Sequence, residues 1–267
     1  MSHEPILPLL EDDLDEGGVI EAHLMHRPRD LAPVAVLCFF NDLLKSLAER
    51  GVLTPRYTLR SEIGSNHVYE VLVGGRPVSV LHPGVGSPLA VGFTEEAAAL
   101  GISTFVACGG AGALDEAFDV GRVMVVDSAL RDEGTSAHYV RPSRVIEAQA
   151  LGVSVASRTL DELGMEHFAG RVWTTDALFR ETPSRVKRRI GEGCHMVDME
   201  ASALIALASY RGLRLAHLLY AGDMVAGVEW DSRHWDRAGS VREALFWAAT
   251  EIALALHDAP EVEGESD

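Results

Sequence analysis

Residues 103–114 read STFVACGGAGAL, an apolar run that leads directly into three glycines within four residues. The first half, 103–108, is typical of a strand buried on both faces of a sheet. Gly109, Gly110 and Gly112 permit positive φ angles and let the backbone approach a ligand closely. Exposed amides in such a loop are suited to hold an anion or a sugar oxygen. A tight strand–helix connection explains the glycines equally well, and this motif alone leaves both interpretations open.

Strands and helices alternate on both sides of this stretch. Apolar runs predict strands, helical spacing predicts helices, and Gly74-Gly75 predicts a hairpin between two strand patterns. The strands include 34–40, 121–127, 170–175 and 215–221, and the helices include 42–50, 88–100, 143–163, 183–191, 201–211 and 240–257. This alternation predicts an α/β fold, a single domain in which a mixed central β-sheet has helices on both faces. Ligands of such folds bind at the carboxyl ends of strands.

Composition limits the partners. The 267 residues carry a formal net charge of −17, which repels nucleic-acid phosphates and anionic lipids and excludes both as partners. No apolar run reaches the roughly 20 residues that a membrane-spanning helix needs. Three separated cysteines indicate reduced thiols and a cytoplasmic protein. The histidines and cysteines lack metal-ligand spacing, so we expect no metal and no organic cofactor.

The chain is expected to hold one domain, residues 19–257. Acidic segments without an apolar pattern flank it at 1–18 and 258–267, and both are predicted to be mobile.

Two segments place carboxylates where strands end. In VDMEASA (197–203), Asp198 and Glu200 lie where a strand meets a helix. A carboxylate there either stabilises the helix N-terminus or accepts hydrogen bonds from vicinal sugar hydroxyls, with Met199 against the sugar face. Asp223 follows a buried strand, where a carboxyl group either closes a turn or acts as a general acid.

Taken in this order, the segments resemble the nucleoside phosphorylase superfamily, which includes uridine phosphorylase, hexameric purine nucleoside phosphorylase and the adenosylhomocysteine nucleosidases. Residues 103–134 are the most specific part, VDMEASAL (197–204) and AGD (221–223) fit the same pattern, and the similarity runs from about residue 30 to 257. The resemblance implies a nucleoside phosphorylase-like fold and a pentosyltransferase. Such an enzyme cleaves a nucleoside to free base and pentose 1-phosphate. It also implies a homo-oligomer, a dimer or hexamer, with phosphate as co-substrate.

The resemblance assigns the sugar-binding part of the site to four residues. Glu200, together with Met199, holds the ribose hydroxyls. Gly109 and Gly110 line the pocket for base and sugar. These roles place the nucleoside at the carboxyl end of the predicted strand 103–108, where the glycines follow.

The same resemblance assigns three further residues to the base and to the 5′ end of the nucleoside. Phe179 packs on the base, and Asp223 protonates a departing purine, because the base otherwise leaves as an anion. His23 reaches the 5′-hydroxyl in a neighbouring subunit. The uracil-reading residues of uridine phosphorylase fall at Thr182 and Ser184, which favours a purine nucleoside.

The family's phosphate-binding residues are replaced. An ungapped alignment places Asn41 at the loop glycine and Lys45 at the loop arginine, whereas a shift of two residues places apolar side chains at both. Arg60 supplies the arginine of a neighbouring subunit only with an insertion, and Ala107 stands at another expected arginine. Because phosphate sites rely on charged, forked donors, two alternatives stay open. One is a nucleoside hydrolase that uses water, and the other is a nucleoside-binding protein with little catalysis.

Overall fold

The computed structural model describes residues 7–11, 14, 16–227, 229–235 and 238–260. The predicted acidic ends therefore lie partly outside the described residues, at 1–6, 12–13, 15 and 261–267. Within the described part of these ends, Pro8–Leu10 form a 3₁₀ turn. Asp258 is the last residue of the final helix and pairs with Arg76, at 2.6 Å. The domain boundaries stay predictions.

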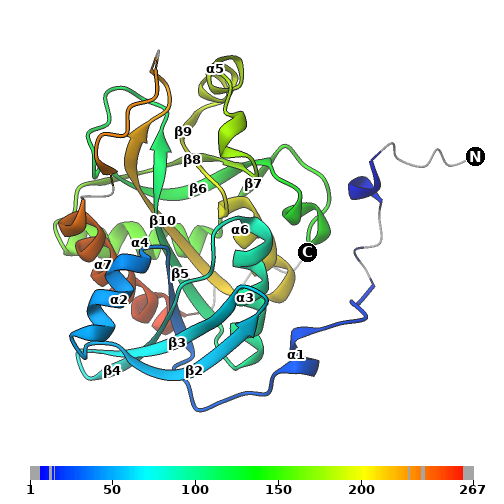
Figure 1. Cartoon of the computed structure of the whole chain (residues 1–267), viewed down its shortest axis with the longest axis vertical. Coiled ribbons are helices and arrows are strands. Elements are labelled where there is room, and N and C mark those ends of the chain that lie inside the picture. The colour runs from blue at the N-terminus through cyan, green and yellow to red at the C-terminus, as the bar shows by residue number, and fades with distance from the viewer. Residues whose placement is uncertain (1–6, 12–13, 15, 228, 236–237, 261–267) are drawn as a thin grey trace, which may run out of the picture.

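A mixed β-sheet forms the centre of the molecule (Figure 1). Its strands are β1 (Val34–Cys38), β2 (Thr54–Ser61), β3 (Gly64–Val73), β4 (Arg76–Leu81), β5 (Thr104–Ala113), β6 (Val123–Asp132), β7 (Val145–Glu147), β8 (His167–Thr175), β9 (Cys194–Asp198) and β10 (Arg214–Met224). The order is β10-β6-β8-β9-β5-β1-β4-β3-β2, with β7 beside β6. An additional β10–β5 pairing closes β5, β10, β6, β8 and β9 on one another.

Helices cover both faces of the sheet. They are α1 (Ala22–Met25), α2 (Asn41–Glu49), α3 (Ser87–Ala99), α4 (Ala150–Glu162), α5 (Pro183–Gly191), α6 (Ala201–Arg211) and α7 (Gly239–Asp258), with short 3₁₀ turns η2 (Thr135–His138) and η3 (Leu178–Arg180). One apolar core contains residues of α2, α4 and α7, and a second contains residues of α3 and α6. The predicted α/β fold with helices on both faces is confirmed.

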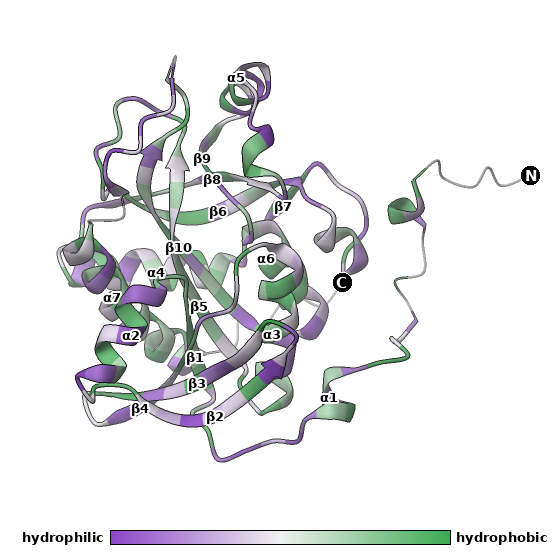
Figure 2. Cartoon of the chain, in the orientation of Figure 1, coloured by the Kyte–Doolittle hydropathy of each residue, from purple (hydrophilic) through white to green (hydrophobic). Residues whose placement is uncertain are grey.

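Helix α6 is central to the second core. All residues from Ala201 to Ala208 are buried, and Figure 2 shows its ribbon largely in the hydrophobic colours. A helix that is apolar all round is enclosed by other elements. It ends, as predicted, at Gly212, whose φ of 64° is the left-handed conformation of a helix C-cap. The buried start of α6 is therefore a rigid platform for the residues before it.

The glycine motif takes a different form from the one predicted. Gly109, Gly110 and Gly112 continue β5, and none of them has a positive φ. The strand extends because β10 pairs with it as far as Ala113. A Cβ at Gly112 would lie 2.6 Å from Val225, so this glycine makes room for a side chain of the protein itself.

Two further expectations about local structure were wrong. Asp223 does not follow its strand but belongs to it, because β10 runs on to Met224. The segment 143–163, predicted as one helix, contains β7 before α4.

Candidate functional site

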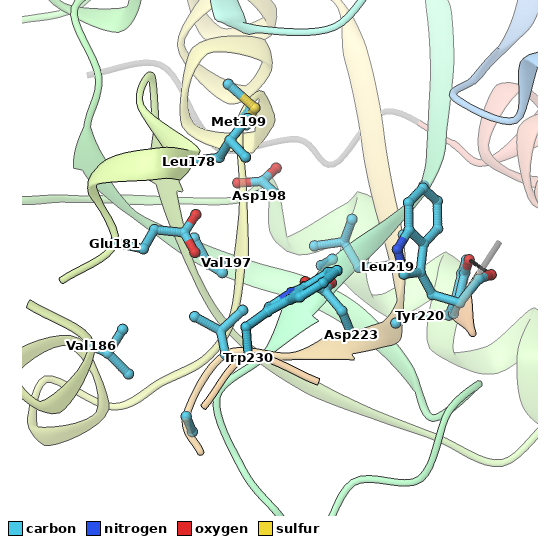
Figure 3. Close-up of a pocket in the computed structure, with 18 of the residues that line it drawn as sticks. Leu178, Glu181, Val186, Val197, Asp198, Met199, Leu219, Tyr220, Asp223 and Trp230 are labelled. Atoms are coloured by element: carbon cyan, nitrogen blue, oxygen red, sulfur yellow. Dashed lines mark hydrogen bonds between the residues drawn. The ribbon is translucent and has the colours of Figure 1, made fainter. Parts of the chain in front are cut away.

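A cavity of about 1040 Å³ opens where β5, β9 and β10 end. This volume is at the upper end of the range for small-molecule sites, about 300–1,000 Å³. Six of the residues predicted for the site line it: Gly109, Gly110, Phe179, Met199, Glu200 and Asp223. Figure 3 shows side chains from η3, α5, β9 and β10 converging on this space. The sequence prediction and the cavity therefore select the same region.

Glu200 lies at the junction of β9 and α6 and is buried, with 8% of its surface exposed. Its carboxylate accepts a 2.6 Å hydrogen bond from the backbone N–H of Gly86, which precedes α3. Burial, and next the negative charge of Asp198, raise the pKa of Glu200 to about 8. A buried carboxyl group with one oxygen anchored in this way is suited to exchange hydrogen bonds with hydroxyl groups of a ligand.

Asp198 supports the start of α6. Its carboxylate accepts hydrogen bonds from the backbone N–H groups of Ala201, at 2.7 Å, and Glu200, at 3.2 Å. The Thr174 hydroxyl donates a third, at 2.7 Å. Burial raises the pKa of Asp198 to about 6. Of the two alternatives for this acid pair, helix capping thus falls to Asp198, and Glu200 remains the carboxyl group available to a ligand.

Asp223 and Glu181 also line the pocket. Asp223 accepts a 2.7 Å hydrogen bond from the indole N–H of Trp230. Glu181, between η3 and α5, is half-buried, and burial followed by the charge of Asp223 raises its pKa to about 7. Phe179 borders the cavity but is 92% exposed, so it is free to contact a ligand rather than the protein core.

Close contacts of the glycines shape the cavity wall. A Cβ on Gly109 would lie 3.2 Å from the ring of Phe39, and one on Gly110 would lie 3.1 Å from Tyr220. Both aromatic rings also line the cavity. The glycines therefore make room for aromatic side chains as well as for a ligand.

The residues predicted to bind phosphate do not line this cavity. Asn41 and Lys45 are exposed on α2, and Arg60 is exposed on β2. The cations in the described lining are Lys187 and Arg242. His23, predicted to serve a neighbouring subunit, is exposed on α1, outside the cavity.

Arg242 is tied to its own chain. Its guanidinium donates to the Tyr220 hydroxyl at 3.1 Å and to the Asp42 carboxylate at 2.8 Å. It also lies over the rings of Phe40 and Trp235, at 5.3 and 5.2 Å from their centroids. Binding a phosphate there requires that Arg242 share its donors with Tyr220 and Asp42.

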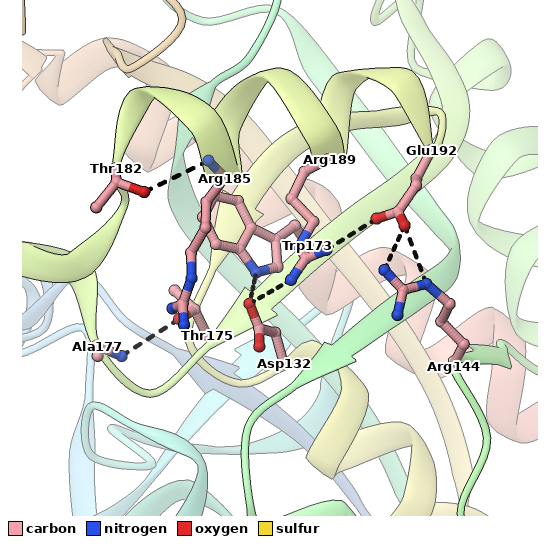
Figure 4. A network of polar contacts seen from close by, with 9 residues as sticks. All are labelled: Asp132, Arg144, Trp173, Thr175, Ala177, Thr182, Arg185, Arg189 and Glu192. Carbon is pink, nitrogen blue, oxygen red and sulfur yellow. Dashed lines mark hydrogen bonds and ion pairs between the residues drawn. The ribbon is translucent and has the colours of Figure 1, made fainter.

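A network of polar contacts holds α5 against the sheet (Figure 4). Arg189 of α5 donates to Asp132 of β6 at 2.8 Å and to Glu192 at 3.0 Å. The indole of Trp173 donates to the same oxygen of Asp132, and Arg144 bonds Glu192. Because α5 forms one wall of the cavity, this network fixes the wall near the segment that carries Glu181.

His217 of β10 also lines the cavity, and sequence reasoning missed it. It is 3% exposed, and neither ring nitrogen has a hydrogen-bond partner among the described residues. Burial lowers the pKa of His217 to about 3, so the ring is neutral at pH 7. Its ring stacks on Phe39, with centroids 6.4 Å apart. Glu181 and Trp230 were missed as well, although the rule that sites follow strand ends points to the segment after β8 that holds Glu181.

Comparisons with known proteins agree with the fold. The family model of the phosphorylase superfamily matches residues 33–255. The guanosine phosphorylase of Halorubrum lacusprofundi is 28% identical over 231 residues, which are 85% of this chain and 86% of that protein. The uridine phosphorylase of Escherichia coli is 29% identical over 174 residues, 58% of this chain and 64% of its own. The crystal structure of Vibrio fischeri uridine phosphorylase has a TM-score of 0.68 at 20% identity, over 88% of this chain and 96% of that chain.

An α/β domain built on a mixed sheet is the class of structure that this chain shares with the solved uridine phosphorylase. The chain belongs to the phosphorylase superfamily, and the resemblance drawn from its sequence is confirmed. No described helix is long and apolar enough to cross a membrane. In the same part of the chain, no group of three or more His, Cys, Asp or Glu residues is placed to hold a metal ion.

Proposed function

We propose that this protein cleaves the N-glycosidic bond of a purine nucleoside and transfers the pentose to phosphate, releasing the free base. The observation that carries this proposal is that two acidic groups, Glu200 and Asp223, line one pocket. Glu200, at the start of α6, is buried and accepts a hydrogen bond from Gly86. Asp223, at the end of β10, accepts one from Trp230. A nucleoside that bridges them meets Glu200 with its ribose and Asp223 with its base.

The chemistry of this bond explains why both groups are needed. The bond breaks through an oxocarbenium-like state, in which positive charge grows on the sugar and negative charge on the base. A carboxyl group that accepts hydrogen bonds from the 2′- and 3′-hydroxyls orients the sugar throughout. Hydrogen bonding or proton transfer at the base stabilises the leaving group. Met199 and Phe179, which both line the cavity, supply apolar contacts to sugar and base.

A purine is favoured by the base end of the pocket. Asp223 and Glu181 are acids. They suit a purine because protonation of a ring nitrogen stabilises the base as it leaves. The relatives include a guanosine phosphorylase and uridine phosphorylases, so the comparisons support a nucleoside without choosing its base.

Hydrolysis is the second candidate, and one observation favours it. Asn41, Lys45 and Arg60 lie outside the cavity of the single chain, and Arg242 is already paired with Asp42. A pocket with few free cations binds a phosphate dianion weakly, whereas water needs no cation. A nucleoside-binding protein with little catalysis is the third reading, because a binder also needs Glu200.

One assay separates these three candidates. Base release is measured from a panel of purine and pyrimidine nucleosides, each with and without inorganic phosphate. Release that requires phosphate, with pentose 1-phosphate as product, supports the phosphorylase. Equal release in both conditions, with free pentose as product, supports the hydrolase. Nucleoside binding without release supports the binding protein and contradicts an enzyme.

A homo-oligomer, dimer or hexamer, forms part of the proposal. His23 and Arg60 are exposed and outside their own pocket, as residues that serve a neighbouring subunit should be. Large apolar side chains are exposed around His23, at Val19, Ile20, Leu24 and Met25. Exposed apolar groups gathered in this way mark interaction surfaces. Light scattering coupled to gel filtration tests this, and a monomer at assay concentration would contradict it.

A further inference from the structure

Glu181 is the acidic residue of the pocket whose carboxyl group makes no hydrogen bond to any described residue. It connects η3 to α5, and its backbone N–H bonds the carbonyl of Leu178 at 3.3 Å. The side chain is half-buried and lines the cavity. Figure 3 shows its carboxyl group directed into the same part of the pocket as Trp230 and Asp223. The group is thus positioned by its backbone and left free for a ligand.

Asp223 differs in this respect. Its Oδ2 accepts the 2.7 Å hydrogen bond from the Trp230 indole. An indole N–H is a donor only, so this oxygen acts as an acceptor. The bond orients the Asp223 carboxyl group and fixes its Oδ2 as an acceptor.

We propose that Glu181 is the general acid that protonates the departing base, and that Asp223 accepts hydrogen bonds that hold the base in place. The proposal rests on the proposed cleavage of a purine nucleoside. It differs from the role that the family resemblance assigns to Asp223. Phe179, two residues before Glu181, contacts the base from the same segment.

The protonation of Glu181 suits this role. Its pKa of about 7 arises first from burial and then from the charge of Asp223, so the group carries a proton in a large share of molecules at neutral pH. An acid whose pKa lies near the working pH is the most effective proton donor. The helix α5 that follows Glu181 is anchored by Arg189 to Asp132, which keeps the segment in place.

The proposed step balances in atoms and charge. The bond between C1′ of the sugar and N9 of the purine breaks, and its electron pair stays with the base. The proton of the Glu181 carboxyl group moves to N7 of the base, while an oxygen of phosphate forms the new bond to C1′. The proton that the bound phosphate ester then loses, or a proton from water, restores the acid.

A 7-methylated purine nucleoside tests the step directly, because its base already carries a positive charge and leaves without a proton. Rates are compared for guanosine and 7-methylguanosine with inorganic phosphate. The variants are Glu181→Gln, which keeps the shape of the side chain, Asp223→Asn, and the control Glu116→Gln, which changes an exposed residue outside the pocket. Circular dichroism and thermal melting establish that each variant is folded.

Loss of a general acid costs about 100-fold or more in rate. We therefore expect Glu181→Gln to lower kcat for guanosine by about 100-fold while changing kcat for 7-methylguanosine by less than about 5-fold. The control should match the wild type. Equal losses on both substrates would overturn the proposal, since Glu181 then only shapes the site. If Asp223→Asn selectively lost kcat for guanosine while Glu181→Gln was unaffected, the proton donor would be Asp223. Wild-type protein that cleaves neither nucleoside would instead remove the proposed function itself.

Discussion

The carboxylate of Glu200 and the backbone N–H of Gly86 are joined by a 2.6 Å hydrogen bond. Glu200 precedes α6 and Gly86 precedes α3, so the bond ties the starts of two neighbouring helices together. The Ser87 hydroxyl adds a 2.7 Å bond to the carbonyl of Met199 between the same segments. Because Glu200 and Met199 line the cavity, the position of the loop before α3 controls the position of the proposed sugar-binding residues.

Replacing Glu200 by alanine removes the proposed contact with the sugar hydroxyls. We expect Glu200→Ala to lower kcat/KM by at least about 100-fold, which corresponds to about 2.7 kcal/mol of transition-state stabilisation. The fold should persist, because the side chain of Asp198, and not that of Glu200, accepts the hydrogen bonds of the N–H groups at the start of α6. Steady-state kinetics and circular dichroism check the two statements, and near-normal activity would remove Glu200 from the site.

Gly86 has a φ of 89°, which side chains other than glycine rarely adopt. Gly86→Ala should therefore shift the loop and weaken its bond to Glu200, at a strain of about 1–3 kcal/mol. Gly51 is a matched control, since its φ is 72° and, as at Gly86, an added Cβ meets nothing within 4 Å. Both variants should lose stability in urea unfolding, with the larger loss at Gly86, whose φ of 89° and ψ of 143° are almost confined to glycine, but only Gly86→Ala should lose activity. Equal activity in the two would show that the loop does not position the site.

The Asp198 carboxylate accepts hydrogen bonds from two backbone N–H groups at the start of α6 and from the hydroxyl of Thr174. Asp198→Ala should lower the free energy of unfolding by about 1–3 kcal/mol, since the loss of a cap leaves buried donors without a partner. It should also impair activity, because Glu200 begins the same helix. Denaturant unfolding measures the first effect, with the exposed Asp30→Ala as control. An unchanged midpoint would mean that other groups satisfy the start of α6.

The sequence predicted the alternation of strands and helices because that information is local. The apolar runs of β1, β5 and β10 and the stop of α6 at Gly212 each depend on neighbouring residues only. The extension of β5 through Gly109 to Ala113 was not predictable in this way. It depends on pairing with β10, which is about 100 residues away in the chain.

The residues of the candidate site show the same difference between local and long-range information. Glu200, Met199 and Asp223, which line the cavity, were predicted because they immediately precede a helix or end a strand, in a pattern that resembles the family's. His217 lies inside an apolar strand and carries no local signal of its own. Its place in the cavity wall comes from the pairing of β10 with β5, which sets His217 beside Ala107. The acid Glu181 stands out only once Asp223 is known to share its pocket.

His217 makes the stability of the protein depend on pH. Its pKa falls from 6.5 to about 3 on folding, so between these values the unfolded chain binds the proton and the folded chain does not. The free energy of unfolding should fall as the pH drops from 6.5 towards 3, by up to about 1.4 kcal/mol per pH unit from this group. Leucine at this position has no proton to bind, so His217→Leu should remove that part of the slope. The exposed His138→Leu should leave it unchanged.

The same variant tests whether the imidazole is unsatisfied at neutral pH. Both ring nitrogens lack a partner among the described residues, and an unpaired buried polar group costs about 1–3 kcal/mol. Urea unfolding at pH 7 should therefore show His217→Leu to be more stable than the wild type by about 1 kcal/mol. A less stable variant would indicate that water or a ligand group already satisfies the ring. Adding a nucleoside to both proteins then shows whether that group comes from the ligand, because only the wild type would gain the contact.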